Sequence, residues 1–129
     1  MGFTPYGSPT YSSLTVTNGL TVSGGSVTFA PNVPLGVNGG VDISGAGYGL
    51  AVAEGTNAKQ GVATLSAGTV VVANTSVTAT SRIFLTTNTP GGTPGWLQVS
   101  ARTAGTSFTI LSSSSTDTSV VAYEIFQPG

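Results

Sequence analysis

The sequence predicts an all-β protein, because strand- and turn-forming residues dominate it and no amphipathic helical pattern occurs. β-branched Val and Thr, which favour the pleated strand, recur throughout. Its 19 glycines and 7 prolines supply turns between short strands. Texture divides the chain into an extended N-terminal arm (residues 1–13), a short β-repeat stalk or attachment region (residues 14–56) and a small antiparallel jelly-roll or β-sandwich head (residues 57–129).

The N-terminal arm carries three aromatic residues and no charge. Phe3, Tyr6 and Tyr11 are separated by prolines and a glycine, so no strand fits there. Aromatic side chains contribute much of the apolar area of protein interfaces. We therefore predict that these three residues bind a groove on a partner; a frayed tail is the alternative.

The stalk region begins with a repeat of six residues. Residues 14–19 and 20–25 each combine an apolar–Thr–apolar piece with a turn pair, and residues 26–31 form a degraded third copy. Such a short strand can bury its apolar face only against stacked repeats or against other copies of the chain. An ordinary hairpin turning at Asn18 and Gly19 is the alternative. Further along, only short strand candidates occur, at residues 40–44 and 50–53.

The head contains six candidate strands separated by turn-rich pieces, the pattern of a sandwich or jelly roll. The candidates are residues 62–65, 69–73, 81–86, 96–101, 107–111 and 119–126. Alternation along them predicts a core of Val70, Val72, Ile83, Leu85, Leu97, Val99, Phe108, Ile110, Val121, Tyr123 and Ile125.

The small size of the head predicts self-association. A domain of this length buries roughly 60% of its unfolded surface and is marginally stable alone, and the chain has no cysteine for a disulfide. Phe84, Trp96, Val120 and Phe126 fall on faces or strand ends opposite the predicted core. We expect these four residues to form the interface of a homotrimer.

The low content of charged residues argues against catalysis and metal binding by this chain. Three basic residues, four acidic residues and no histidine leave few groups for proton transfer or metal binding, so we predict no catalytic residue, no cofactor and no metal site. The near-neutral balance predicts no nucleic-acid partner, and the lack of a long apolar run predicts no membrane partner. The open alternatives are calcium held by Asp117 with hydroxyls of residues 112–115, and a carboxylate pair using Asp117 or Glu124. Asn74 also begins a glycosylation sequon.

Several stretches of the head, in order, resemble a module found in many tailed-bacteriophage virion proteins. They are residues 59–79, 81–86, 99–102, 104–110, 117–119 and 123–125. The resemblance covers about residues 57–127, and Tyr123 stands where that module often has tryptophan. It implies a trimeric β head of the kind found on tail fibres, head fibres and capsid decoration proteins, with no catalytic residues to carry over.

The short region before the head leads us to expect a non-enzymatic capsid decoration, or cement, protein. In this reading the arm and stalk bind the major capsid protein lattice, the homotrimer stabilises the shell, and the protein lies on the capsid surface of the virion. The alternative is a short head or tail fibre protein that binds a host-surface glycan through Trp96, Tyr48 and residues 90–95. A small carbohydrate-active enzyme using Asp117 or Glu124 is the third possibility.

Overall fold

The fold is seen in a computed structural model, which describes residues 15–24, 27–29 and 34–128. The predicted arm, with Phe3, Tyr6 and Tyr11, lies outside the described residues. The chain divides into two units, residues 1–43 and 44–129, and all strands of the described residues belong to the second unit. In that described part, no helix is both long enough and apolar enough to cross a membrane.

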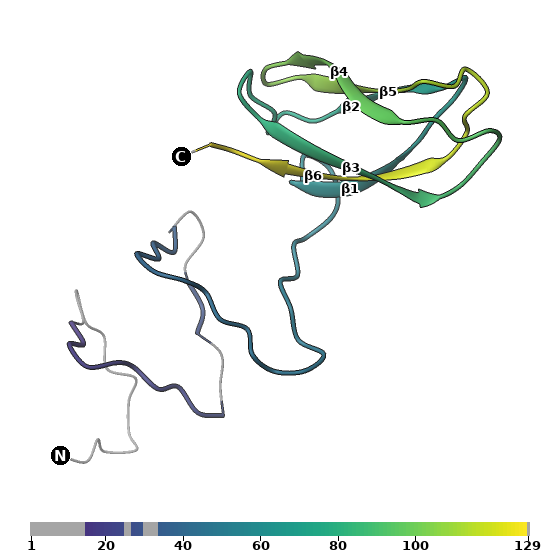
Figure 1. Ribbon diagram of the computed structural model, residues 1–129. Coiled ribbons are helices and arrows are strands. Elements are labelled where there is room, and N and C mark those ends of the chain that lie inside the picture. Colours follow the sequence, from purple (N-terminus) through teal and green to yellow (C-terminus); the bar gives the residue numbers. More distant parts are fainter. Residues whose placement is uncertain (1–14, 25–26, 30–33, 129) are drawn as a thin grey trace. The chain divides into compact units, whose positions relative to one another are not determined.

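The head is a two-layer β-sandwich, as predicted (Figure 1). Its strands are β1 (Gln60–Thr64), β2 (Thr69–Ala73), β3 (Arg82–Thr89), β4 (Leu97–Thr103), β5 (Ser107–Ser112) and β6 (Val120–Phe126). One antiparallel sheet has the order β1-β6-β3 and the other the order β2-β5-β4. The pairing is nested: the first strand pairs with the last and the second with the fifth, as in a rolled-up hairpin.

The predicted strands are confirmed, and β3 and β4 continue furthest past the ends that alternation indicates. β2 has the predicted bounds, whereas β3 continues to Thr89 and β4 to Thr103. Each of these strands contains an irregularity in its register, between Thr87 and Thr89 in β3 and between Val99 and Ala101 in β4. A bulge shifts the alternation without ending the hydrogen bonding, so the sequence pattern stops before the strand does.

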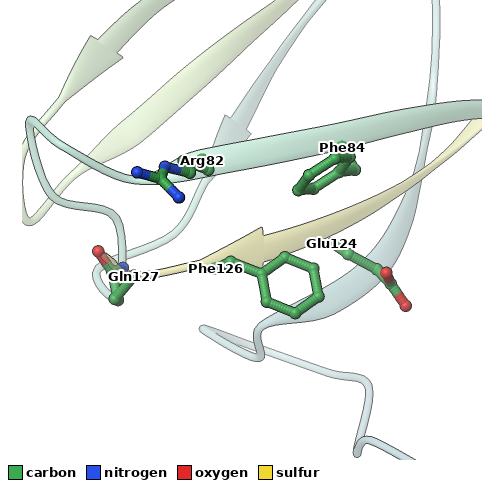
Figure 2. A pocket seen from close by; sticks show the side chains of 5 residues that line it. All are labelled: Arg82, Phe84, Glu124, Phe126 and Gln127. Carbon is green, nitrogen blue, oxygen red and sulfur yellow. The ribbon is translucent and has the colours of Figure 1, made fainter. Parts of the chain in front are cut away.

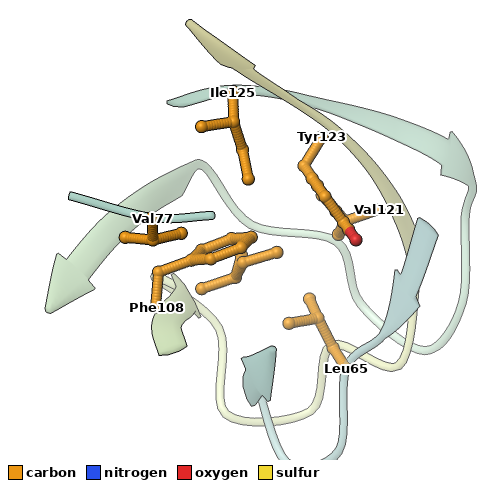
Figure 3. Close-up of a cluster of buried hydrophobic side chains, with 7 residues drawn as sticks. Leu65, Val77, Phe108, Val121, Tyr123 and Ile125 are labelled. Carbon is orange, nitrogen blue, oxygen red and sulfur yellow. The ribbon is translucent and has the colours of Figure 1, made fainter. Parts of the chain in front are cut away.

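The core lies between the two sheets and contains every predicted core residue. Its buried members, drawn in Figure 3, are Leu65, Val77, Phe108, Ile110, Val121, Tyr123 and Ile125. Leu65 and Val77 come from connections between strands. Val77 was not predicted, because alternation says nothing about residues in loops, whereas Leu65 stood at the end of the candidate strand 62–65 and was left out of the predicted core. Phe108 meets Tyr123 edge to face at 5.1 Å between ring centroids, which joins the two layers.

The region before the head differs from the expectation for it. The described residues of 15–53 form no strand, so the strand candidates at 40–44 and 50–53 are wrong for the single chain. Gly19 has a positive φ of 108°, at the predicted turn pair. Alternation provides an apolar face, but such a face needs paired neighbouring strands, and the described residues of 15–53 form none among themselves. The β-repeat stalk therefore stays a prediction.

Candidate functional site

Three connections join at one end of the sandwich and form a surface that we call the Trp96 platform, made of residues 66–68, 90–96 and 112–118. Thr118 N donates to Gly91 O at 3.0 Å, and Thr93 N donates to Thr116 O at 3.3 Å. Gly68 joins the third connection, because its carbonyl accepts from Ser112 N at 2.7 Å. These backbone hydrogen bonds join the three connections to one another and fix their positions.

Asp117 organises the platform from its interior, where it is 1% exposed. Its Oδ2 accepts hydrogen bonds from the Ser112 hydroxyl at 2.6 Å and from Gly95 N at 3.0 Å. Its Oδ1 accepts from Ser119 N at 2.9 Å. The hydrogen bonds from Ser112, then from Ser119 and Gly95, hold the pKa of this carboxyl well below its usual range. The carboxylate of Asp117 is thus ionised, and both of its oxygens already accept hydrogen bonds from the platform loops.

Trp96 lies on this platform with its backbone fixed and its side chain free. Its N–H donates to the Ser113 hydroxyl at 3.0 Å, and its carbonyl accepts from Ser113 N at 3.0 Å. The side chain is nevertheless 65% exposed. The Ser113 hydroxyl that accepts from the Trp96 backbone belongs to the connection of residues 112–118, which also holds the bonded pair Ser114 and Thr116. A flat apolar ring beside hydroxyl groups suits a sugar, which has apolar C–H faces and hydrogen-bonding edges.

A second surface is the outer face of the sheet β1-β6-β3, which points away from the core. It consists of Gln60, Val62, Thr64, Arg82, Phe84, Thr86, Val120, Ala122, Glu124 and Phe126. Phe84 and Phe126 meet edge to face, with ring centroids 5.4 Å apart. A shallow hollow of about 540 Å³ lies over this pair and is also lined by Arg82, Glu124 and Gln127 (Figure 2).

The structure brings together three of the four residues predicted for a trimer interface. Phe84, Val120 and Phe126 share the outer face, whereas Trp96 immediately precedes β4 in the other sheet. Sequence reasoning did not group Arg82 and Glu124 with the aromatic pair. Two-residue alternation along β3 and β6 could have found them, since both have the parity of the phenylalanines.

Tyr48 and Asn74, two other residues singled out from the sequence, differ in surroundings. Tyr48 is largely exposed and lies outside the strands. Asn74 is buried; its Nδ2 donates to Ala58 O at 2.7 Å, and its Oδ1 accepts from the Ser76 hydroxyl at 2.6 Å. A glycan on Nδ2 would displace the bond to Ala58, so the folded chain presents no free acceptor amide at this sequon.

One family model matches residues 57–126, more than half of the chain, and the chain belongs to that family: the C-terminal domain of K1 capsule-specific polysaccharide lyase. The match begins where the head was predicted to begin. A search of curated proteins found no significant match.

The family corrects the expectation of a non-enzymatic protein. It is named for a domain of a polysaccharide lyase, which points to an enzyme-associated function. The scarcity of histidines and carboxylates speaks only about catalysis by this chain's own side chains. It says nothing about whether the chain acts together with an enzyme. In the described ranges, no group of three or more His, Cys, Asp or Glu residues could hold a metal ion.

Proposed function

We propose that this chain is a virion protein of a bacteriophage tail, of the spike type, and that its head binds a polysaccharide of the host surface through the Trp96 platform. In this proposal the head works together with a polysaccharide lyase, which the family name supports. Its contribution is to hold the carbohydrate near that enzyme. The tail-fibre alternative from the sequence agrees with the family better than capsid decoration does.

The observation that carries the proposal is the contrast between the backbone and the side chain of Trp96. The backbone is fixed by two hydrogen bonds to Ser113, so little entropy is lost when a ligand binds. The indole is two-thirds exposed. A large aromatic side chain on a fixed backbone, exposed to water, is available to stack on a sugar ring, and hydroxyls of the same platform can bond the ring's edges.

The binding free energy that one Trp96 platform can supply is small, so we expect several platforms to bind one polysaccharide together. Covering half of an indole removes on the order of 100 Å² of apolar surface from water, which corresponds to about 2–3 kcal/mol before the costs of association. One platform alone would therefore bind weakly. Several copies on one assembly, acting on a repeating polysaccharide, raise the effective affinity by avidity. The homotrimer predicted from the size of the head provides such copies, and it remains part of the proposal.

Affinity electrophoresis in gels containing capsular polysaccharide tests the proposal, with K1 capsular polysaccharide and a panel of other capsular types as probes. We expect retardation of the wild-type chain and its loss in Trp96→Ala. Val71→Ala is the matched control, because Val71 is equally exposed, at 65%, on the outward face of β2, away from the platform loops. Equal mobility of wild type and Trp96→Ala in every gel, together with binding to expanded capsids in co-sedimentation, would favour the decoration reading instead.

A further inference from the structure

We propose that the Trp96 platform takes uncharged sugar units and disfavours acidic ones, because it carries a buried carboxylate while the basic residues of the head lie at the other end of the sandwich. The inference rests on the proposed function and names the chemical class of its ligand. It concerns the sugar that the head itself binds, apart from the sugar that a lyase cleaves.

The connections of the head alternate between its two ends, because neighbouring strands run antiparallel. The Trp96 platform contains the connections that follow β1, β3 and β5. The connections that follow β2 and β4 lie at the opposite end, which we call the far end, and there Gly105 N donates to Val77 O at 2.8 Å. The strands that separate the two ends can be followed in Figure 1.

All three basic residues of the sequence lie at the far end. Lys59 precedes β1, and its Nζ donates to Ser76 O at 2.9 Å. Arg82 is the first residue of β3, and Arg102 is the last but one of β4. The strands between them and the platform span about 15–25 Å, given the rise per residue of a strand. This separation exceeds the Debye length of about 8 Å at physiological salt, so these side chains do not attract an anion to Trp96.

The platform itself contributes a negative charge. Among its residues, 66–68, 90–96 and 112–118, only Asp117 is acidic or basic. The carboxylate is buried, and its hydrogen bonds come from uncharged groups of Ser112, Gly95 and Ser119. Hydrogen bonds from neutral donors stabilise the charge without cancelling it, so the electrostatic potential around the neighbouring Trp96 stays negative.

The groups that the platform offers to a ligand suit an uncharged pyranose. The indole provides an apolar surface for the C–H face of the ring. The exposed residues Thr93, Ser113 and Ser115 carry hydroxyls, which donate and accept hydrogen bonds as sugar hydroxyls do. A carboxylate on the sugar would lose water without gaining a cationic partner. Charge alone should therefore distinguish two sugars of the same shape.

Affinity electrophoresis of the full chain tests this with pairs of polymers that differ only in charge. Each acidic capsular polysaccharide of the panel is run beside its carboxyl-reduced form, in which a CH₂OH group replaces each carboxylate. We expect the reduced form to bind about threefold more tightly at low salt, which is the effect of one like charge at roughly 10 Å in a water-rich medium. The difference should narrow in about 0.5 M NaCl, because salt screens the repulsion.

A lysine placed on the platform should change the preference. Ser115→Lys adds a cation at an exposed position of the platform, and should shift the ratio of the two dissociation constants about threefold toward the acidic polymer. Thr103→Lys is the matched control, because it adds the same charge at the exposed last residue of β4, at the far end. The control should keep the ratio of the wild type. The comparison within the wild type needs no variant, so it decides the matter even if a variant unfolds.

The results that would overturn the inference differ from those that would overturn the proposed function. Acidic polymers that bind the wild type as tightly as their reduced forms, or more tightly, contradict the inference and leave the proposed function standing. Equal shifts in Ser115→Lys and Thr103→Lys would also contradict it, because the net charge of the chain would then set the preference. Retardation of the wild type in none of the gels contradicts the proposed function, and the inference with it.

Discussion

The carboxylate of Asp117 accepts a 2.6 Å hydrogen bond from the hydroxyl of Ser112, across the connection between β5 and β6. The same oxygen accepts from Gly95 N, the residue before Trp96. A buried charge thus positions the backbone that presents the exposed indole. The predictions below follow from this arrangement and from the packing around it.

Replacing Asp117 by Asn should destabilise the head at neutral pH, with a fall in Tm of at least about 4 °C. The amide places a donor against the Ser112 hydroxyl or Gly95 N, where the carboxylate accepted two bonds. Thermal melts at pH 7 measure the change. Ser115→Ala, in the same connection but with an exposed side chain, should leave Tm within about 2 °C of the wild type.

The contribution of Asp117 should also depend on pH in one direction. Its pKa in the folded chain lies below the ordinary value of 3.8, so folding favours the ionised form. The stabilisation is therefore complete above about pH 4 and is lost as pH falls below that value. Melts from pH 7 to pH 2.5 should show the wild type approaching Asp117→Asn in stability. A constant gap across that range would contradict the assignment.

Gly92→Ala should cost much more stability than Gly105→Ala, although both glycines have positive φ, at 61° and 67°. A Cβ at Gly92 would clash with the carbonyl oxygen of Thr116, whereas one at Gly105 meets nothing within 4 Å. We expect about 1 kcal/mol for Gly105→Ala from the backbone conformation alone, and about 1–3 kcal/mol more for Gly92→Ala. Urea unfolding measures both; equal losses would mean that the two loops are not packed as described.

The same substitution at two phenylalanines should separate folding from association. Phe108 is 1% exposed in the core, so Phe108→Ala should lower the free energy of unfolding by about 3–5 kcal/mol. Phe84 lies on the outer face, so Phe84→Ala should leave the monomer folded and weaken self-association. Urea unfolding and sedimentation velocity on both variants check this, and a Phe84→Ala chain that associates like the wild type would count against the interface.

Asn74→Asp should destabilise the head by about 1–3 kcal/mol, because an oxygen would replace the Nδ2 donor facing Ala58 O. Thr75→Ala, an exposed neighbour in the same sequon, is the matched control and should be near neutral. Chemical denaturation compares the two. Mass spectrometry after expression in a glycosylating host should find Asn74 unmodified in folded protein.

The sequence predicted the sandwich and its core because alternation in short strands directly reflects which side chains face inward. Val121, Tyr123 and Ile125 illustrate this, since all three are buried as expected. It did not predict the burial of Val77, which lies in a connection where no periodicity applies, and it left Leu65, the last residue of a candidate strand, out of the core. The bulges in β3 and β4 were equally hidden, because they leave local composition unchanged.

The candidate site was predictable only in part. Trp96 was identified as an exposed aromatic beside the Pro-Gly loop, but it was also assigned to the trimer interface with Phe84. The structure separates the two residues because they belong to different sheets, and sheet assignment depends on pairing between distant strands. The role of Asp117 likewise depends on contacts across loops, from Gly95 to Ser119, that no local motif records.

Fluorescence titration is the most direct test of the central claim, because the chain contains one tryptophan and its emission reports Trp96 alone. Adding defined oligosaccharides of the host capsule should shift the emission to the blue and protect the indole from iodide quenching, in a saturable manner. Val71→Ala should respond like the wild type. An unchanged spectrum with oligosaccharides that the protein is shown to bind by calorimetry would place the carbohydrate elsewhere and contradict the account.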